Sequence, residues 1–231
     1  MEKDIKDYRN SELKSYVLGN ILIILISSGL LENIYTLAKE ALSWESILPI
    51  LSSVVLSSVL YIYVFLADSI VPAEWKNKLI WMVKGKPGET IFTSIRKKNR
   101  DYRFSSEQAD ILYKKVYTSI SNVDDKKKKE IENIAWYRIY KKHEEHPQVI
   151  ISHRDFLLCR DMCIMTLLIE IGYVCLQIYL KQPISWKMIL ILVFEFVSCW
   201  IAAYNKSKTF AYNVIALDIS KSEIQESDNN K

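Results

Sequence analysis

The stretch Met162–Leu180, MCIMTLLIEIGYVCLQIYL, decides the fold. Its one charged residue is Glu170, and the stretch Met188–Asn205, MILILVFEFVSCWIAAYN, likewise holds only Glu195. Segments of about 18 to 20 apolar residues match a helix that crosses a hydrocarbon core about 30 Å thick. A long core helix of a soluble domain would instead carry a polar face. Both stretches therefore predict transmembrane helices.

Two further stretches near the N-terminus lack charge altogether. Ile47–Ala67 has no Asp, Glu, Lys, Arg or His, and neither has Tyr16–Leu31, which must run past Glu32 towards Leu37 to span a membrane. The sequence thus predicts a mainly α, integral membrane protein with four transmembrane helices in two helical hairpins and a mostly helical cytoplasmic insert. The predicted segments are an N-terminus of residues 1–15, a hairpin of 16–67, an insert domain of 68–161, a hairpin of 162–205 and a tail of 206–231.

Basic residues predict the orientation. Of the 31 Lys and Arg residues, 20 lie in the insert, four in residues 1–15 and four from Lys206 onward. Loops rich in Lys and Arg stay in the cytoplasm. We therefore expect a multi-pass protein of the cell inner membrane with both termini and the insert cytoplasmic. The net charge of +4 is interpreted as this topology signal, so the lipid bilayer is an expected partner and nucleic acid is not.

Capping and turn residues predict the helices of the insert. The expected elements are an amphipathic helix over Val71–Val83, a short strand over Thr90–Ile95, a helix from Ser105 or Ser106 towards Tyr117, and a helix from Asp124 to Lys142 that Pro147 ends. From Val149 the sequence runs without Pro or Gly into the third membrane helix. The insert is therefore expected to be linked to the membrane by one continuous helix.

The polar residues of the last two apolar stretches follow helical spacing. Glu170 shares a face with Thr166, Tyr173 and Gln177, and Glu195 shares one with Ser198. At 1.5 Å per residue, both carboxylates lie roughly 12 to 15 Å from the cytoplasmic edge. Two interpretations stay open. In the first, a polar pathway for a proton or cation is formed by Thr166, Glu170, Tyr173, Gln177, Glu195 and Ser198. In the second, the carboxylates only hold helices together by hydrogen bonds, as Asn20 could on the first helix.

The segment WYRIYKK, Trp136–Lys142, combines aromatic and basic side chains. Such a surface can stack on and neutralise a nucleotide or phosphate. The predicted ligand-binding residues are Trp136, Tyr137, Arg138, Lys141, Lys142 and Arg154. The same pattern also fits an amphipathic helix whose aromatic rings pack inward and whose bases are solvated.

Signals for catalysis and for metals or cofactors are weak. His143 and His146 are three residues apart, without the cysteine pair or the spacing of a zinc motif. His153-Arg-Asp155 resembles part of a kinase loop, but Arg160 stands where that loop needs Asn, and a Gly-rich loop, nucleophile elbow and Walker lysine are missing. We therefore expect no enzyme, no metal site and no cofactor.

Two motifs, WYRIYKK and HRDFLLCRD at 153–161, the latter leading into a membrane helix, resemble uncharacterised bacterial four-transmembrane-helix proteins found near antiviral defence genes. The resemblance covers residues 72–165 and implies a small membrane sensor or effector. We expect the insert to receive a signal, from an anionic small molecule or a cytosolic protein. The membrane helices of the protein are expected to form a homo-oligomer that gates or permeabilises the membrane. The alternatives are a small proton- or cation-coupled transporter and a membrane anchor for a soluble partner.

Overall fold

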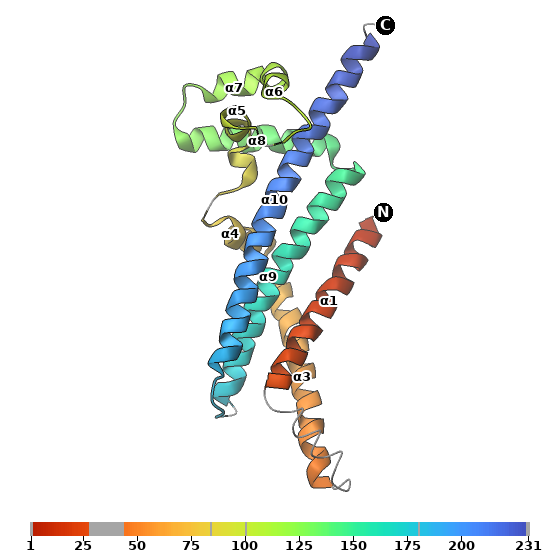
Figure 1. Cartoon of the computed structure of the whole chain (residues 1–231), viewed down its shortest axis with the longest axis vertical. Coiled ribbons are helices and arrows are strands. Elements are labelled where there is room, and N and C mark those ends of the chain that lie inside the picture. The colour runs from red at the N-terminus through yellow and green to blue at the C-terminus, as the bar shows by residue number, and fades with distance from the viewer. Residues whose placement is uncertain (1, 28–43, 84, 100, 180, 230–231) are drawn as a thin grey trace. The chain divides into compact units, whose positions relative to one another are not determined.

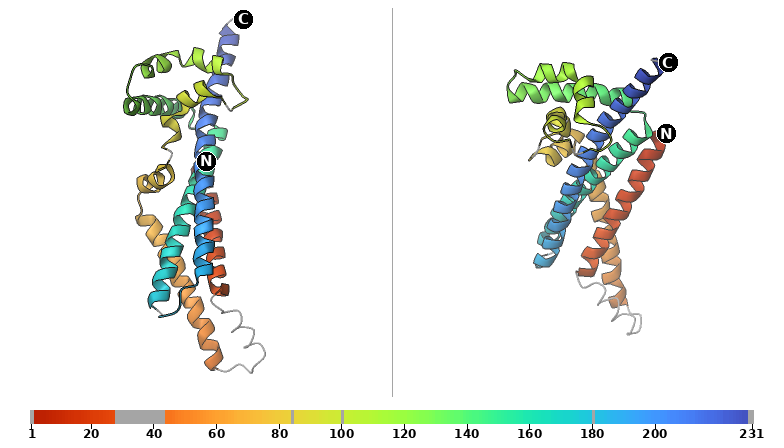
Figure 2. Two further views of the ribbon diagram at one scale, coloured as in Figure 1. Left: turned by 60° about the vertical axis from the view of Figure 1, so that its left-hand side comes forward. Right: turned by 45° about the horizontal axis from the view of Figure 1, so that its top comes forward.

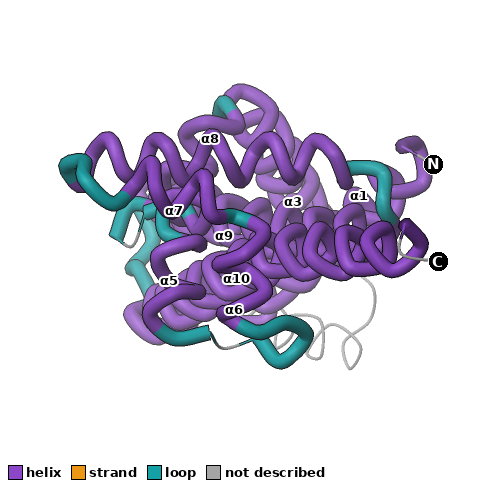
Figure 3. The backbone as a smooth tube through the Cα atoms, turned by 90° about the horizontal axis from the view of Figure 1, so that it is seen from above, coloured by secondary structure: helices purple, strands orange, loops and turns teal. Residues whose placement is uncertain are grey.

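The computed structural model describes residues 2–27, 44–83, 85–99, 101–179 and 181–229. All regular elements within these ranges are helices, with no strand (Figure 3). Along the chain they are α1 (Glu2–Ser27), α3 (Trp44–Ile70), α4 (Ala73–Trp81), the 3-10 helix η1 (Pro87–Glu89), α5 (Ile91–Lys97), α6 (Ser106–Leu112), α7 (Lys114–Ile120), α8 (Asp125–His143), α9 (Pro147–Tyr179) and α10 (Trp186–Asn229). The predicted mainly α class is confirmed.

Two of these helices are long and apolar enough to cross a membrane. They are Pro147–Tyr179 and, within α10, Trp186–Ile224. A third span is possible if Ser58–Ile70 and Ala73–Trp81, which bend by 90° at the break between them, count as one broken span. These apolar helices indicate a membrane location. Of the four predicted transmembrane helices, the first extends into residues 28–43, which lie outside the described residues.

The chain divides into two compact units, and α9 and α10 contribute to both. The apolar unit comprises Met1–Lys78 and Leu158–Ala202, and the insert unit comprises Leu79–Leu157 and Ala203–Lys231. Figure 1 shows each of α9 and α10 as one continuous ribbon. With 33 and 44 residues, at 1.5 Å per residue they measure about 50 and 66 Å, well beyond a hydrocarbon core of about 30 Å.

The core of the apolar unit is built from α1, α3, α9 and α10. Its buried side chains are Leu13, Val17, Ile21, Ile24, Leu60, Val64, Met165, Ile169, Tyr173, Met188 and Leu192. Both views of Figure 2 show α9 and α10 side by side in this part of the chain. Gly172 permits close approach of α9 to α3, because a Cβ there would lie 2.8 Å from Leu60 Cδ1 and 3.1 Å from Tyr63 Cε1. Small residues serve the same purpose between membrane helices generally.

The HRDFLLCRD motif ends in a buried ion pair of the apolar unit. Arg160 and Asp161 are 6% and 1% exposed, and Arg160 Nη2 lies 2.7 Å from Asp161 Oδ1. Arg160 Nη1 also donates to Asn77 Oδ1 of α4 at 2.9 Å. Beside it on α4, Lys76 pairs with Asp68 of α3 at 2.6 Å. These bonds fix Lys76 and Asn77 of α4 against α3 and α9. A buried ion pair such as that of Arg160 is costly to break from one side.

The insert unit packs its short helices around the second half of α10. The buried core comprises Ile91, Phe92, Ile95, Phe104, Ala109, Tyr113, Tyr117, Ile120, Ala211, Ile215, Ala216 and Ile219. Of the predicted tail, residues 206–229 thus continue α10 and supply four of these core side chains. Their spacing of four, one and three residues is that of one helical face.

Two sequence-based expectations for the insert differ from the structure. The strand predicted over Thr90–Ile95 is wrong, since residues 91–97 form helix α5. Ile91 and Phe92 are adjacent, Ile95 follows about one turn later, and all three are buried, so the apolar residues form one helical face. The single helix expected from Ser105 or Ser106 towards Tyr117 is divided at Tyr113 into α6 and α7. Its predicted start is confirmed, because Ser105 caps α6 and accepts a hydrogen bond from Gln108 N at 3.2 Å.

Candidate functional sites

The apolar unit contains a polar cluster formed by Tyr16, Asn20, Thr166, Glu195 and Cys199, here called the Asn20–Glu195 cluster. Asn20 is 2% exposed and donates through Nδ2 to Glu195 Oε1 at 3.2 Å. Tyr16 Oη lies 2.6 Å from Thr166 Oγ1 and 3.5 Å from Cys199 Sγ. Because Thr166 Oγ1 already donates to the Met162 carbonyl at 2.9 Å, the tyrosine hydroxyl is the donor to Thr166. Polar side chains of α1, α9 and α10 are thus joined in one core.

The cluster has one unpaired buried atom. Asn20 Oδ1 has no hydrogen-bond partner among the described residues, whereas both hydrogens of the amide face acceptors, Glu195 Oε1 and the Tyr16 carbonyl. In a membrane, polar groups of this kind hold helices together or line a path for an ion. An unpaired acceptor favours a donor that enters the cluster, such as water or a protonated carboxyl group.

The predicted pathway residues do not form one site. Glu195 and Thr166 belong to the Asn20–Glu195 cluster, but Glu170 is half-buried and, among the described residues, makes no hydrogen bond or ion pair. Tyr173 is buried, and its hydroxyl accepts from the Ser185 backbone at 3.1 Å, just before α10 begins. Ser198 is exposed and donates to the Phe194 carbonyl of its own helix at 2.8 Å. Gln177 is half-buried.

The sequence analysis omitted three members of this cluster from its site. Asn20 is the one side-chain amide of the charge-free stretch Tyr16–Leu31, and Tyr16 precedes it by one turn. Cys199 follows Glu195 by one turn. These i, i+4 pairs were the available signal. Which carboxylate they approach depends on how three helices pack.

A second polar cluster lies in the insert unit, around Asp218 of α10. Asp218 is 6% exposed, and its Oδ1 accepts from His143 Nε2 at 2.7 Å and from Lys142 Nζ at 2.9 Å. Its Oδ2 accepts from Tyr113 Oη at 2.9 Å. Burial alone would raise the pKa of Asp218, but the hydrogen bonds from His143, Lys142 and Tyr113 outweigh it and hold that pKa below its usual value. This Asp218 cluster joins the end of α8 and the α6–α7 junction to α10.

A third buried carboxylate, Glu132 of α8, caps α5. Glu132 is 1% exposed, and its Oε2 accepts from the backbone N–H groups of Phe92 at 3.0 Å and Thr93 at 3.2 Å. The Thr93 hydroxyl donates to the other oxygen. Burial raises the pKa of Glu132 despite these bonds. The role of this carboxylate is structural, because all its contacts satisfy the first turn of a short helix.

The predicted ligand-binding residues are spread over the insert unit. Trp136 is half-buried and packs against the core, where its Nε1 donates to the Ala211 carbonyl at 3.3 Å and its ring stacks on Tyr140 at 5.7 Å. Three of the bases pair with carboxylates of this chain: Lys141 with Glu144 at 2.7 Å, Lys142 with Asp218 at 2.9 Å and Arg154 with Asp155 at 3.1 Å. Tyr137 and Arg138 are exposed.

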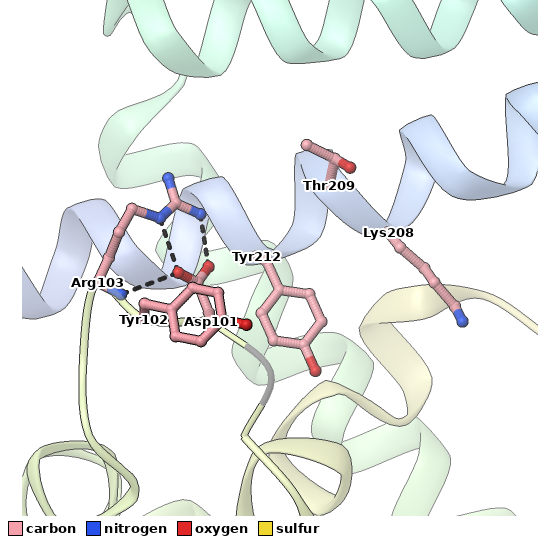
Figure 4. Close-up of a pocket in the computed structure, with 6 residues that line it drawn as sticks. All are labelled: Asp101, Tyr102, Arg103, Lys208, Thr209 and Tyr212. Atoms are coloured by element: carbon pink, nitrogen blue, oxygen red, sulfur yellow. Dashed lines mark hydrogen bonds and ion pairs between the residues drawn. The ribbon is translucent and has the colours of Figure 1, made fainter.

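Two pockets open beside α10 in the insert unit. The first, of about 320 Å³, lies between α10 and the loop that joins α5 to α6 (Figure 4). We call it the tyrosine pocket, lined by Asp101, Tyr102, Arg103, Lys208, Thr209 and Tyr212. The second, of about 440 Å³, lies between the first turns of α9 and the middle of α10. It includes the ion pair of Lys206 with Asp155, whose Nζ and Oδ2 are 2.9 Å apart.

The histidines do not converge. His143 contacts Asp218, whereas His146 lines the second pocket and the His153 ring stacks on Phe210 at 4.7 Å. Within the described ranges, no group of three or more His, Cys, Asp or Glu side chains could hold a metal ion.

Comparison with known proteins gives no relative. No protein-family model matches the chain, and neither a curated protein nor a solved structure does. Functional inference therefore depends on the geometry of this chain.

Proposed function

We propose that this chain is a bacterial inner-membrane sensor and effector. Its insert unit faces the cytoplasm and receives a signal, and its membrane helices associate with those of other copies to gate or permeabilise the membrane. The proposal draws on the excess of Lys and Arg in the insert for orientation. The resemblance of WYRIYKK and HRDFLLCRD to proteins near antiviral defence genes extends it to a defence role.

One observation carries the proposal. Each of α9 and α10 supplies buried side chains to the cores of both units: Val149 and Met165 on α9, and Leu192 and Ile215 on α10. A shift of either helix in one core is a shift of the same helix in the other, because a continuous helix carries no break to absorb it. An anchor for a soluble partner would need no such shared helices.

The test is the release of a dye from liposomes that contain the full chain. Assembly of several copies predicts that the release rate rises more steeply than in proportion to the protein-to-lipid ratio, and that crosslinking traps oligomers. Absence of release at every ratio, with monomers alone after crosslinking, would contradict the effector and favour the anchor.

A coupled transporter is the second candidate, and the Asn20–Glu195 cluster favours it. A carboxylate beside a buried unpaired amide oxygen offers a place for a proton or cation. In that case a pH difference across the liposome membrane drives uptake of a solute without dye release, and Glu195→Gln abolishes the uptake. Dye release that Glu195→Gln leaves unchanged would reject this candidate.

A further inference from the structure

Hydrogen bonds tie together residues 99, 101, 103 and 104 before α6, while the side chain of Tyr102 lies in solvent. Asn99 Nδ2 donates to the Phe104 carbonyl at 2.6 Å, and the Asp101 N–H donates to Asn99 Oδ1 at 3.0 Å. Arg103 donates two hydrogen bonds to the Asp101 carboxylate, from Nε to Oδ1 at 2.9 Å and from Nη2 to Oδ2 at 2.6 Å. Tyr102, between them, is fully exposed. An exposed aromatic ring buries no apolar surface and therefore does not stabilise the fold, so the ring of Tyr102 is available for a ligand.

The ring of Tyr102 faces a pocket that α10 completes. Figure 4 shows Asp101, Tyr102 and Arg103 on the loop, and Lys208, Thr209 and Tyr212 on α10. Lys208 and Tyr212 are one helical turn apart and so point to the same side of α10. The volume of about 320 Å³ is at the lower end for small-molecule sites. Two phenol rings with space between loop and helix suit a flat, conjugated ligand.

The charges of the tyrosine pocket favour an anion. Burial alone would raise the pKa of Asp101, but the hydrogen bonds from Arg103 lower it, so the acid is charged and its charge is already matched. Arg103 is 42% exposed at the side chain and keeps N–H groups for a further acceptor. Lys208 lies with Nζ 4.7 Å from the centre of the Tyr204 ring and pairs with no carboxylate of the described residues. The surplus charge of the pocket is therefore positive.

We propose that the tyrosine pocket binds a nucleotide. The base stacks on Tyr102 and Tyr212, and Lys208 and Arg103 bind the phosphate. Stacking on aromatic rings accepts any base, since each has a flat face, and Arg and Lys are the usual partners of phosphate. The pocket lies on α10, so its occupant is the signal of the sensor described above. That last step rests on the proposed function, whereas binding itself does not.

The test measures binding to the full chain in detergent by calorimetry, with adenosine monophosphate, adenosine, ribose 5-phosphate and inorganic phosphate as probes. Adenosine monophosphate is expected to bind with a Kd below about 1 mM, and each of the other three more weakly, because each lacks the base or the phosphate. Tyr102→Ser is expected to weaken binding roughly 5- to 150-fold, the range for loss of one stacked ring. Lys208→Gln is expected to weaken it and to reduce its dependence on salt.

Two exposed positions provide matched controls. Ile111→Ser removes an exposed apolar side chain of α6 and Lys115→Gln an exposed charge of α7, and neither should change binding. The proposal is overturned if adenosine monophosphate does not bind, if inorganic phosphate binds as tightly, or if Tyr102→Ser binds like the wild type. It is also overturned if Tyr137→Ser weakens binding and Tyr102→Ser does not, since the ligand then lies on α8.

Dye release separates this proposal from the proposed function. Release by a chain that binds no nucleotide overturns the tyrosine pocket and supports the effector. Binding that Tyr102→Ser abolishes, in a chain that never releases dye, supports the pocket and overturns the effector.

Discussion

Removal of the Asp218 carboxylate is expected to loosen the insert unit by an amount that the cluster geometry sets. In Asp218→Ala, His143 Nε2 and Tyr113 Oη lose their partner while buried, at a cost of about 1–3 kcal/mol each. Lys142 is 58% exposed at the side chain and regains water. The two costs sum to about 2–6 kcal/mol, and the usual loss of about 3–5 kcal/mol when a buried ion pair is broken from one side lies within that range and is the value expected here.

Hydrogen exchange of the full chain, followed by mass spectrometry, measures this loss. Amides at the end of α8 and around residue 218 should exchange roughly 100- to 4,000-fold faster in Asp218→Ala, since each 1.4 kcal/mol is tenfold. Asp218→Asn keeps one acceptor, for His143, and its NH2 group can donate to the Tyr113 hydroxyl in place of accepting from it. The loss is then mainly of charge assistance, so the expected change is about 1–2 kcal/mol, or roughly 5- to 30-fold. Glu145→Gln removes an exposed carboxylate nearby and is the control. Equal exchange rates in all four proteins would refute the role of Asp218.

The pH dependence of this exchange follows from the lowered pKa of Asp218. A carboxyl group whose pKa is lower in the folded state stabilises it fully above the unfolded value, near 3.9, and loses that effect as pH falls through the folded value. Protection in the wild type, after correction for intrinsic exchange, should therefore be constant above about pH 5 and fall below about pH 4. Asp218→Asn should not show this fall in protection. If the fall persists in Asp218→Asn, another titrating group causes it.

Three further predictions concern contacts between distant segments. Asn20→Leu and Glu195→Leu should be non-additive in the thermal stability of the detergent-solubilised chain, by about 1 kcal/mol or less, whereas Glu170→Leu should add independently; additivity of the first pair would exclude their hydrogen bond. Glu132→Ala should speed amide exchange in residues 91–97, because loss of the cap costs about 1–3 kcal/mol; unchanged exchange there would show that α5 does not need the cap. Gly172→Leu should lower thermal stability by about 1–3 kcal/mol through overpacking against α3, and a neutral effect would mean that the two helices do not approach closely at that position.

Local signals in the sequence predict the helix boundaries of the insert. Ser105 and Gln108 form the capping box that begins α6, and Pro147 stands at the first position of α9. Such signals need only neighbours within one turn. The absence of Pro and Gly after Val149 predicted that the insert and the apolar stretch from Met162 share one helix, and α9 confirms this.

The errors of the sequence analysis arise where a partner is distant in the chain. Residues 91–95 are rich in β-forming side chains, but the carboxylate of Glu132, about forty residues later, satisfies the first turn of a helix there. Glu195 was paired with Glu170 because their depths match, whereas its partner in the structure is Asn20. Periodicity shows which residues share a face and not which helix that face meets.

The candidate site residues of the insert were harder to find than its helices. Asp218 follows Val214 by four residues on the buried face of α10. This spacing indicated a carboxylate at a core position. That signal was available, but residues 206–231 were assigned to a tail. Nothing in the sequence brings Tyr102 to Tyr212, because their common pocket results from the packing of a loop on a helix more than one hundred residues later.

The central claim is that α9 and α10 carry a change in the insert unit to the apolar unit. The rate of dye release from liposomes by wild type and by Asp218→Ala, at equal protein-to-lipid ratio, tests it most directly. Asp218 lies in the insert unit, on helix α10, which continues into the apolar unit. The account predicts a change in rate of roughly fivefold or more, the lower end of coupling between sites, with Glu145→Gln unchanged. Equal rates for wild type and Asp218→Ala, with faster amide exchange in the insert, would contradict it.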